Sequence, residues 1–142
     1  RTKMKYPCSA YTEVSGIVYF ARMLDKIRLY AAGELPEAYH TNLGIGLFDD
    51  QCCKLLGVTY SDISEHAKKE NDNEKVLQWC FANGKKNSEE QILIWNAFMT
   101  KKGFRDDFSE KLKKFKAELG LANRDEIQTL FDFYEFDEER RK

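Results

Sequence analysis

Apolar residues recur at helical spacing through residues 17–32, and no other feature of the sequence constrains the fold as strongly. At about 100° per residue, one face of a helix there collects Ile17, Phe20, Ala21, Leu24, Ile27 and Ala31. The pattern predicts a helix that begins near Ser15 or Gly16 and ends at Ala32, before a left-handed stop at Gly33. Other elements must cover its apolar face, because such a stripe is stable only when it is buried.

Six further segments carry helix signals, and none shows the alternation of polar and apolar residues that is typical of a strand. The predicted helices cover about 48–56, about 60–70, Asp72 to 83, Ser88 to Lys102, about 106–119, and Asn123 to Phe136. Four of them begin at favourable N-caps: Thr59 or Ser61, Asp72, a capping box from Ser88 to Gln91, and the pair Asn123 and Glu126. The sequence therefore predicts an all-α protein of six to seven short helices.

Length and composition favour a single compact domain. A chain of 142 residues, 42% of them hydrophobic, can bury one core and is too short for two comfortable ones. We expect one helical domain over residues 1–142, with residues 1–5 disordered or a remnant outside the fold. The longest irregular stretch is the glycine-bearing loop at about 33–46, and long loops on compact domains often carry function.

Charge and hydropathy argue against nucleic acid and membranes as partners. The 23 basic and 24 acidic residues give a net charge of −1, so the protein as a whole has no positive charge to attract nucleic acid or an anionic membrane. Residues 101–116 are locally basic, but their lysines lie opposite an apolar stripe, as on an ordinary solvated helix face. No run reaches the roughly 18 apolar residues of a membrane span, and no secretion signal opens the chain. We expect a cytoplasmic protein.

The cysteines and histidines give no sign of a metal site. The four cysteines lack the C-x-x-C spacing of zinc sites and are expected to be reduced core thiols: Cys8, Cys52, Cys53 and Cys80. His40 and His66 have no second ligand at a regular metal spacing. We therefore expect neither a metal nor a cofactor.

Arg28 is the candidate centre of a ligand site, because it falls inside the apolar arc of the helix predicted at 17–32. A buried guanidinium cannot escape by losing its proton, so it must find a carboxylate, carbonyl groups or a bound anion. Arg22 and Lys26 fall on the opposite side, which we expect to face solvent, and Asp25 there can reach Arg22 or Arg28. A purely structural network, or snorkelling at the helix edge, would also satisfy Arg28.

Asn96 is a second polar residue on an apolar helix face, on the helix predicted from Ser88 to Lys102. Apolar residues occupy most of that helix's circumference, and Asn96 falls among them. A buried carboxamide there would bond the backbone or brace Arg28. With His40 from the 33–46 loop, the candidate ligand-binding residues are Arg28, Asp25, Asn96, Arg22 and His40, and no residue is assigned a catalytic role.

Three functions fit these residues. The leading hypothesis is a non-enzymatic module that binds an anionic small molecule or a protein partner, because the guanidinium fork presents paired donors to carboxylate or phosphate. The second is an enzyme that uses a carboxylate as general base while Arg28 orients the substrate, the candidates being Asp25, Asp49 and Asp50. The third is a homodimer that associates through Phe133 and Phe136, although core packing would also bury these rings.

Several segments together resemble one protein family: Val14–Val18, Arg22–Arg28, Leu55–Val58, Trp95–Phe98, and Asp125 through Arg140. The chain is similar to a bacterial family of short single-domain proteins known as domain of unknown function 5069. The most specific segment is an R-[ML]-[LI]-D-K-x-R run, which maps onto Arg22 to Arg28. Where the family would open with Arg-Ser-Pro, this chain has Cys8-Ser9-Ala10. The resemblance implies a stand-alone, soluble bacterial helical protein and supplies no activity, cofactor or catalytic residue.

Overall fold

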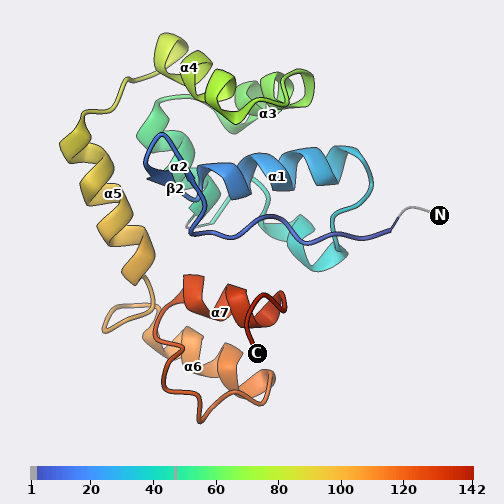
Figure 1. Ribbon diagram of the computed structural model, residues 1–142, viewed down its shortest axis with the longest axis vertical. Helices are drawn as coiled ribbons and strands as arrows, with labels where there is room; N and C mark the ends of the chain where they lie inside the picture. Colours follow the sequence, from blue (N-terminus) through green and yellow to red (C-terminus); the bar gives the residue numbers. More distant parts are fainter. Residues whose placement is uncertain (1–2, 47) are drawn as a thin grey trace.

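The computed structural model describes residues 3–46 and 48–142, and helices make up most of this part of the chain (Figure 1). The elements follow in the order β1 (Glu13–Val14), β2 (Ile17–Val18), α1 (Phe20–Ala31), the 3-10 helix η1 (Glu37–Asn42), α2 (Phe48–Leu56), α3 (Tyr60–Lys69), α4 (Asn73–Asn83), α5 (Glu89–Lys101), α6 (Ser109–Glu118) and α7 (Leu130–Asp137). The structure confirms the predicted fold class, a single domain of six to seven short helices. It also contains a small β-hairpin.

The hairpin β1–β2 corrects the expectation of no strand. Val14 pairs with Ile17 across a two-residue turn, and both turn residues, Ser15 and Gly16, have positive φ angles of 48° and 82°. Such turns suit the twist of a hairpin. The first helix therefore begins at Phe20, later than predicted. Two-residue strands are too short to produce a readable alternation in the sequence.

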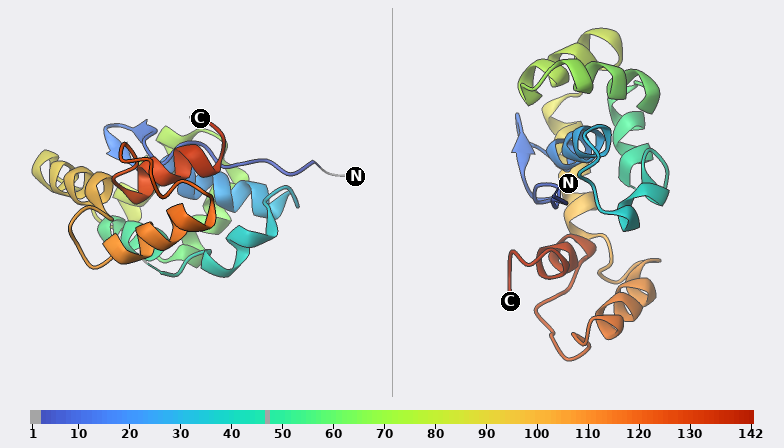
Figure 2. Two further views of the ribbon diagram at one scale, coloured as in Figure 1. Left: turned by 90° about the horizontal axis from the view of Figure 1, so that it is seen from below. Right: turned by 90° about the vertical axis from the view of Figure 1, so that its right-hand side faces the viewer.

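Helix α1 is the central element, with other elements on several sides of it (Figure 2), and seven of its 12 residues are buried. The hairpin and α3 pack against it, and all five residues from Phe20 to Leu24 are buried. Arg22 and Lys26, predicted to face solvent, are only 3% and 7% exposed. That prediction was wrong because the periodicity identifies one apolar face but not the elements that cover the opposite side.

The local helix signals fix most element boundaries correctly. Thr59 and Asp72 cap α3 and α4 with their side chains, and Ser88 and Gln91 form the predicted capping box of α5. Helix α6 begins at Ser109, after a turn that the carboxylate of Asp106 holds.

The N-cap predicted for the last helix, Asn123 with Glu126, was also wrong. Helix α7 begins at Leu130, and the Thr129 side chain accepts from the Asp132 amide at 3.1 Å. Upstream, the ammonium group of Lys116 donates to the carbonyls of Arg124 (2.8 Å) and Ile127 (3.1 Å). These bonds hold the connection between α6 and α7 in a turn rather than a helix.

The aromatic residues of α7 attach the α6–α7 pair to the rest of the molecule. Phe131 is fully buried, and its ring lies 5.3 Å from Tyr11, 6.1 Å from Tyr19 and 5.6 Å from Phe48. Phe133 and Phe136 are 5% and 8% exposed. These two rings belong to the core, so the hypothesis that they dock a partner chain was wrong.

The N-terminal segment runs alongside the body rather than apart from it (Figure 1). The amide of Lys5 donates to the Glu34 carbonyl at 2.9 Å, and the two side chains form an ion pair at 3.0 Å. These contacts order Lys5, whereas the expectation of disorder for residues 1 and 2 lies outside the described residues.

Candidate functional site

Arg28, the predicted centre, binds the end of helix α3. Its Nε donates to the Ala67 carbonyl at 3.2 Å, and its terminal nitrogens donate to the Glu70 carbonyl (2.8 Å) and to Oδ1 of Asn73 (2.6 Å). The last carbonyls of a helix lack intrahelical partners. This guanidinium therefore supplies hydrogen-bond donors to the carbonyls at the end of α3 and links α3 to the start of α4. Of the expected partners, Arg28 has found carbonyl groups, and its side chain is half-buried.

Asn96 bonds the backbone of the hairpin, one of its two expected partners. Its Oδ1 accepts from the Val18 amide at 3.1 Å, and its Nδ2 donates to the Gly16 carbonyl at 2.6 Å. The neighbouring indole of Trp95 donates to the Val18 carbonyl at 3.0 Å. Asn96 therefore fixes α5 against the hairpin and does not brace Arg28.

Asp25 and His40 also have local partners. The Asp25 carboxylate accepts from the Cys8 amide at 2.9 Å, and Nε2 of His40 lies 2.9 Å from the Leu35 carbonyl. Asp25, Asn96, His40 and Arg28 thus hold separate parts of the fold together, and none of the four lines the large cavity of the molecule.

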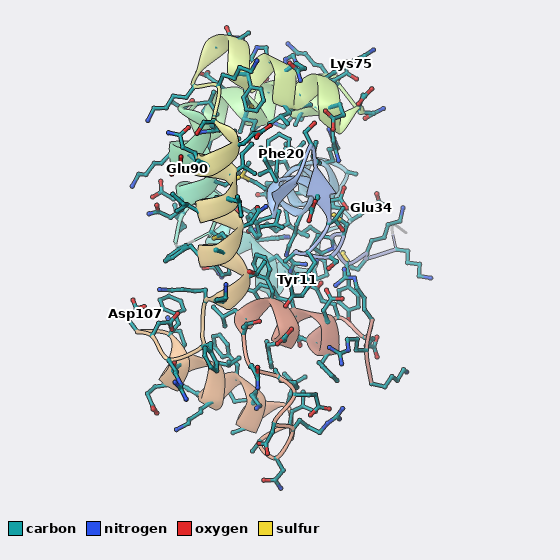
Figure 3. All side chains as sticks on the ribbon, turned by 60° about the vertical axis from the view of Figure 1, so that its left-hand side comes forward. Tyr11, Phe20, Glu34, Lys75, Glu90 and Asp107 are labelled. Atoms are coloured by element: carbon teal, nitrogen blue, oxygen red, sulfur yellow. The ribbon has the colours of Figure 1, made fainter. Side chains whose placement is uncertain are left out.

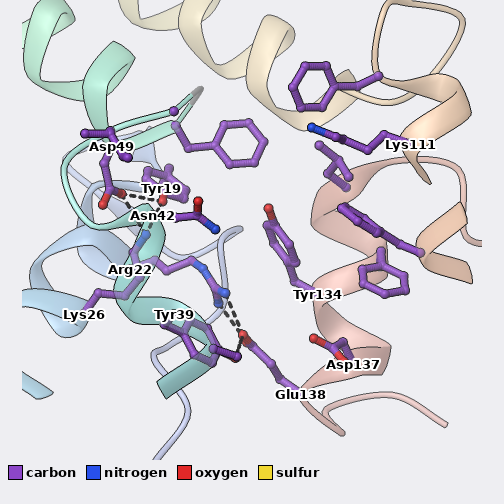
Figure 4. A pocket seen from close by; sticks show the side chains of 18 of the residues that line it. Tyr19, Arg22, Lys26, Tyr39, Asn42, Asp49, Lys111, Tyr134, Asp137 and Glu138 are labelled. Atoms are coloured by element: carbon purple, nitrogen blue, oxygen red, sulfur yellow. Dashed lines mark hydrogen bonds and ion pairs between the residues drawn. The ribbon is translucent and has the colours of Figure 1, made fainter. Parts of the chain in front are cut away.

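That cavity, of about 580 Å³, opens between α1, η1 and the start of α2 on one side and α6 and α7 on the other (Figure 4). Its size is typical of small-molecule pockets. Of the predicted site residues, only Arg22 lines it. Other side chains that line it are Tyr19, Lys26, Tyr39, Asn42, Phe48, Asp49, Phe108, Lys111, Phe115, Glu118, Phe133, Tyr134, Asp137 and Glu138.

Arg22 forms a bidentate ion pair with Glu138 at one side of the cavity (Figure 4). The two N–O distances are 2.8 Å and 2.6 Å, and the side chains are only 4% and 1% exposed. Burial alone would raise the pKa of Glu138, but hydrogen bonds and charge from Arg22, with further bonds from Tyr39 and Arg140, lower it below its ordinary value of 4.5. The pair therefore stays ionised and joins α1 to the end of α7.

Lys26, Tyr19 and Asp49 form a second buried cluster on the same wall. The ammonium group of Lys26 donates to Oδ1 of Asp49 at 2.8 Å and to the Tyr19 hydroxyl at 2.7 Å, and that hydroxyl donates to the same Oδ1 at 2.6 Å. Burial lowers the pKa of Lys26, and the Asp49 carboxylate opposes this shift. The amide of Gly44 donates to Oδ2 of Asp49 at 3.0 Å, which brings the 33–46 loop to the cluster.

Gly44 must be glycine for two reasons. Its φ angle is 74°, in the left-handed region, and an added Cβ would lie 2.6 Å from the ring of Tyr60. The loop can therefore present its amide to Asp49 only with glycine at this position.

The opposite wall carries aromatic rings, and both walls carry donors that have no protein acceptor. The stripe predicted along α6 is only partly covered, so Phe108 and Phe115 face the cavity beside Phe133. Within residues 3–46 and 48–142, the side-chain polar groups of Tyr134, Asn42 and Lys111 make no hydrogen bond or ion pair. Burial raises the pKa of Tyr134 to about 12, so its hydroxyl keeps its proton at neutral pH.

The carboxylates considered as general bases all have partners. Asp25 and Asp49 are bonded as described above, and Asp50 pairs with Lys54 at 2.8 Å on the surface of α2. No carboxylate of this set faces the cavity unpaired, which is the arrangement that the general-base hypothesis requires. Asp137, which was not in this set, does line the cavity, and burial raises its pKa above the ordinary value.

Sequence reasoning missed most of the cavity. Lys26, Tyr19 and Asp49 come together only through the fold, although Arg22 and Lys26 at i and i+4 do share one face of α1. No local signal marks Tyr134 or Glu138, which lie more than a hundred residues further along the chain.

Within residues 3–46 and 48–142, no helix has the length and apolar character needed to cross a lipid bilayer. No group of three or more histidine, cysteine, aspartate or glutamate side chains gathers there as metal ligands would.

Comparison with protein families gives a match that extends over residues 4–140 and so over nearly the whole chain. The matching family is described as Domain of unknown function (DUF5069). The chain belongs to this family. No curated protein matches the chain. The DUF5069 family supplies no activity, so any function must be argued from the cavity itself.

Proposed function

We propose that this DUF5069 protein binds a small organic carboxylate in the cavity between α1 and the α6–α7 pair. The observation that carries the proposal is the group of unpaired donors of Tyr134, Asn42 and Lys111 on the cavity walls. Both oxygens of Asp49 and of Glu138 already accept hydrogen bonds from the protein. The carboxylates of Glu118 and Asp137 also line the cavity and form no hydrogen bond or ion pair within residues 3–46 and 48–142, so the ligand carboxylate must lie against the donors and away from these two acids.

The aromatic wall favours a ligand with an apolar body. Phe108, Phe115 and Phe133 offer ring surface to such a body, while the donors orient its carboxylate. The charges of Arg22 and Lys26 are already neutralised by their own acids, so ring contact and hydrogen bonds carry more of the affinity than charge does.

The role we propose is binding without catalysis, in the cytoplasm. The pairing of Asp25, Asp49 and Asp50 supports a binding role over general-base chemistry. Three buried free thiols support a reducing compartment: Cys52, Cys53 and Cys80.

Calorimetric titration with benzoate, cyclohexanecarboxylate and uncharged benzamide tests this function. We expect the two carboxylates to bind and benzamide to bind more weakly. Tyr134→Phe removes one hydroxyl donor and should weaken benzoate binding about five- to tenfold. Arg28→Lys, which lies outside the cavity, is the control and should bind as the wild type does. If neither carboxylate binds, or if both variants bind benzoate as the wild type does, the proposal is wrong.

A further inference from the structure

Helix α5 runs along one side of the molecule and has an outer face that the described chain leaves uncovered (Figure 3). Its inner residues Trp95 and Met99 are buried, whereas Leu93, Ile94 and Phe98 are 69%, 64% and 49% exposed. Single exposed apolar residues are ordinary, but a contiguous group on one helix face marks an interaction surface.

The α5 outer face carries an acidic residue near its N-terminal end, apolar residues along its middle and a basic residue at its C-terminal end. It consists of Glu90, Leu93, Ile94, Ala97, Phe98 and Lys101, which fall within one arc at about 100° per residue and are all exposed. Glu90 lies near the N-terminal end, on the outer side of α5 (Figure 3), and Lys101 is the last residue of the helix. Neither residue forms an ion pair within residues 3–46 and 48–142.

We propose that the α5 outer face binds the same face of a second copy of this chain, with the two helices antiparallel. A two-fold axis placed midway between residues 95 and 96 would set Glu90 opposite Lys101, Leu93 opposite Phe98, and Ile94 opposite Ala97. Each acid then meets a base, and each large apolar side chain meets another apolar residue. The face is therefore complementary to itself, as an isologous interface requires.

Two features favour this partner and this orientation. A parallel pair would place Glu90 opposite Glu90 and Lys101 opposite Lys101, where like charges repel. In the antiparallel pair, the small side chain of Ala97 faces Ile94, which lets the helix axes approach to about 8–10 Å. A single helix face makes a small interface, so the dimer depends on concentration.

Sedimentation equilibrium between about 1 µM and about 1 mM measures this association. We expect the average mass to rise with concentration from 16.6 kDa toward twice that value. Ile94→Asp should keep the protein monomeric over this range, with an unchanged melting temperature because the side chain is exposed.

Charge reversal then tests the orientation. Glu90→Lys and Lys101→Glu should each raise the dissociation constant about tenfold or more, because each repels its own copy at two symmetric contacts. An equimolar mixture of the two variants should associate again, since every contact across the mixed pair joins opposite charges. Glu89→Lys makes the same charge change in the same helical turn, but Glu89 lies about 100° around the helix from Glu90 and outside the arc of the face, so this variant should dimerise as the wild type does.

A monomer at every concentration overturns the proposal and leaves the α5 outer face to a different partner. An Ile94→Asp dimer as strong as the wild type places the interface elsewhere and overturns it as well. A mixture of the reversed variants that stays monomeric contradicts the antiparallel arrangement.

Discussion

The ion pair between Arg22 and Glu138 holds two charges away from water at the junction of α1 and α7. Glu138→Gln would leave the buried guanidinium without a counter-charge, which should lower the free energy of unfolding by about 3 kcal/mol. Urea denaturation measures this loss. Glu139→Gln, at the exposed next position, is the matched control and should change stability by less than about 0.5 kcal/mol. Equal losses in the two variants would contradict the role of the pair.

The same pair should make stability depend on pH. The folded protein holds the pKa of Glu138 below its ordinary value of 4.5, which applies when the chain is unfolded. The stabilisation is therefore complete above the unfolded pKa and is lost as the pH falls through the folded pKa. Between about pH 6 and about pH 3, the wild type should lose more unfolding free energy than Glu138→Gln does. Parallel pH profiles for the two proteins would exclude this linkage.

Arg28 and Lys26 show what the sequence can and cannot predict about the surroundings of a single residue. The placement of Arg28 on an apolar face correctly required carbonyl or acidic partners, because a guanidinium cannot shed its charge. The burial of Lys26 could not be predicted, since the residues that cover it come from α2 and the hairpin end rather than from α1. Periodicity within one helix contains no information about such distant neighbours.

At the scale of elements, Arg28 is a clamp between α1 and the junction of α3 with α4. Arg28→Met removes its three hydrogen bonds and should cost about 1–2 kcal/mol, while Arg28→Lys should recover part of that loss. Amide hydrogen exchange should quicken in the last turn of α3 in the methionine variant. Benzoate affinity should stay unchanged, because Arg28 lies outside the cavity. A loss of benzoate binding in Arg28→Met would contradict this placement and show that Arg28 belongs to the ligand site.

Element boundaries were predictable where their cause is local. The caps at Thr59, Asp72 and Ser88 follow from side chains within three residues of the helix start. The starts of α1 and α7 were mispredicted because distant groups set them. Tyr19 is held by a hydrogen bond from its amide to the Ala10 carbonyl at 3.0 Å, and Lys116 holds the turn before α7.

At the scale of the whole molecule, Phe131 joins the α6–α7 pair to the N-terminal part of the chain. Phe131→Ala should lower the free energy of unfolding by about 3–5 kcal/mol, because the ring is fully buried. The wild type should unfold in one transition, seen alike by far-UV circular dichroism and by tryptophan fluorescence from Trp79 and Trp95. Two separate transitions, with α6 and α7 melting first, would show that the two parts fold independently.

The helical class and the single domain followed from periodicity and composition, but the cavity did not. Its walls come from residues 19–49 and 108–138, which meet only after folding. The apolar stripe of α6 was recognised as a buried surface, yet the sequence could not show that Phe108 and Phe115 remain partly uncovered. Incomplete burial depends on how two distant segments fit together, and this fit determines whether a pocket exists.

Amide shifts in a two-dimensional ¹H–¹⁵N spectrum during benzoate titration test the central claim most directly. We predict saturable shifts that cluster in residues 38–49, 108–119 and 130–138, with none in α3 or α4. The Tyr134→Phe variant should show the same cluster at higher benzoate concentrations. Shifts centred on Arg28 and the end of α3, or no saturable shift for any carboxylate, would contradict the assignment of the cavity as the binding site.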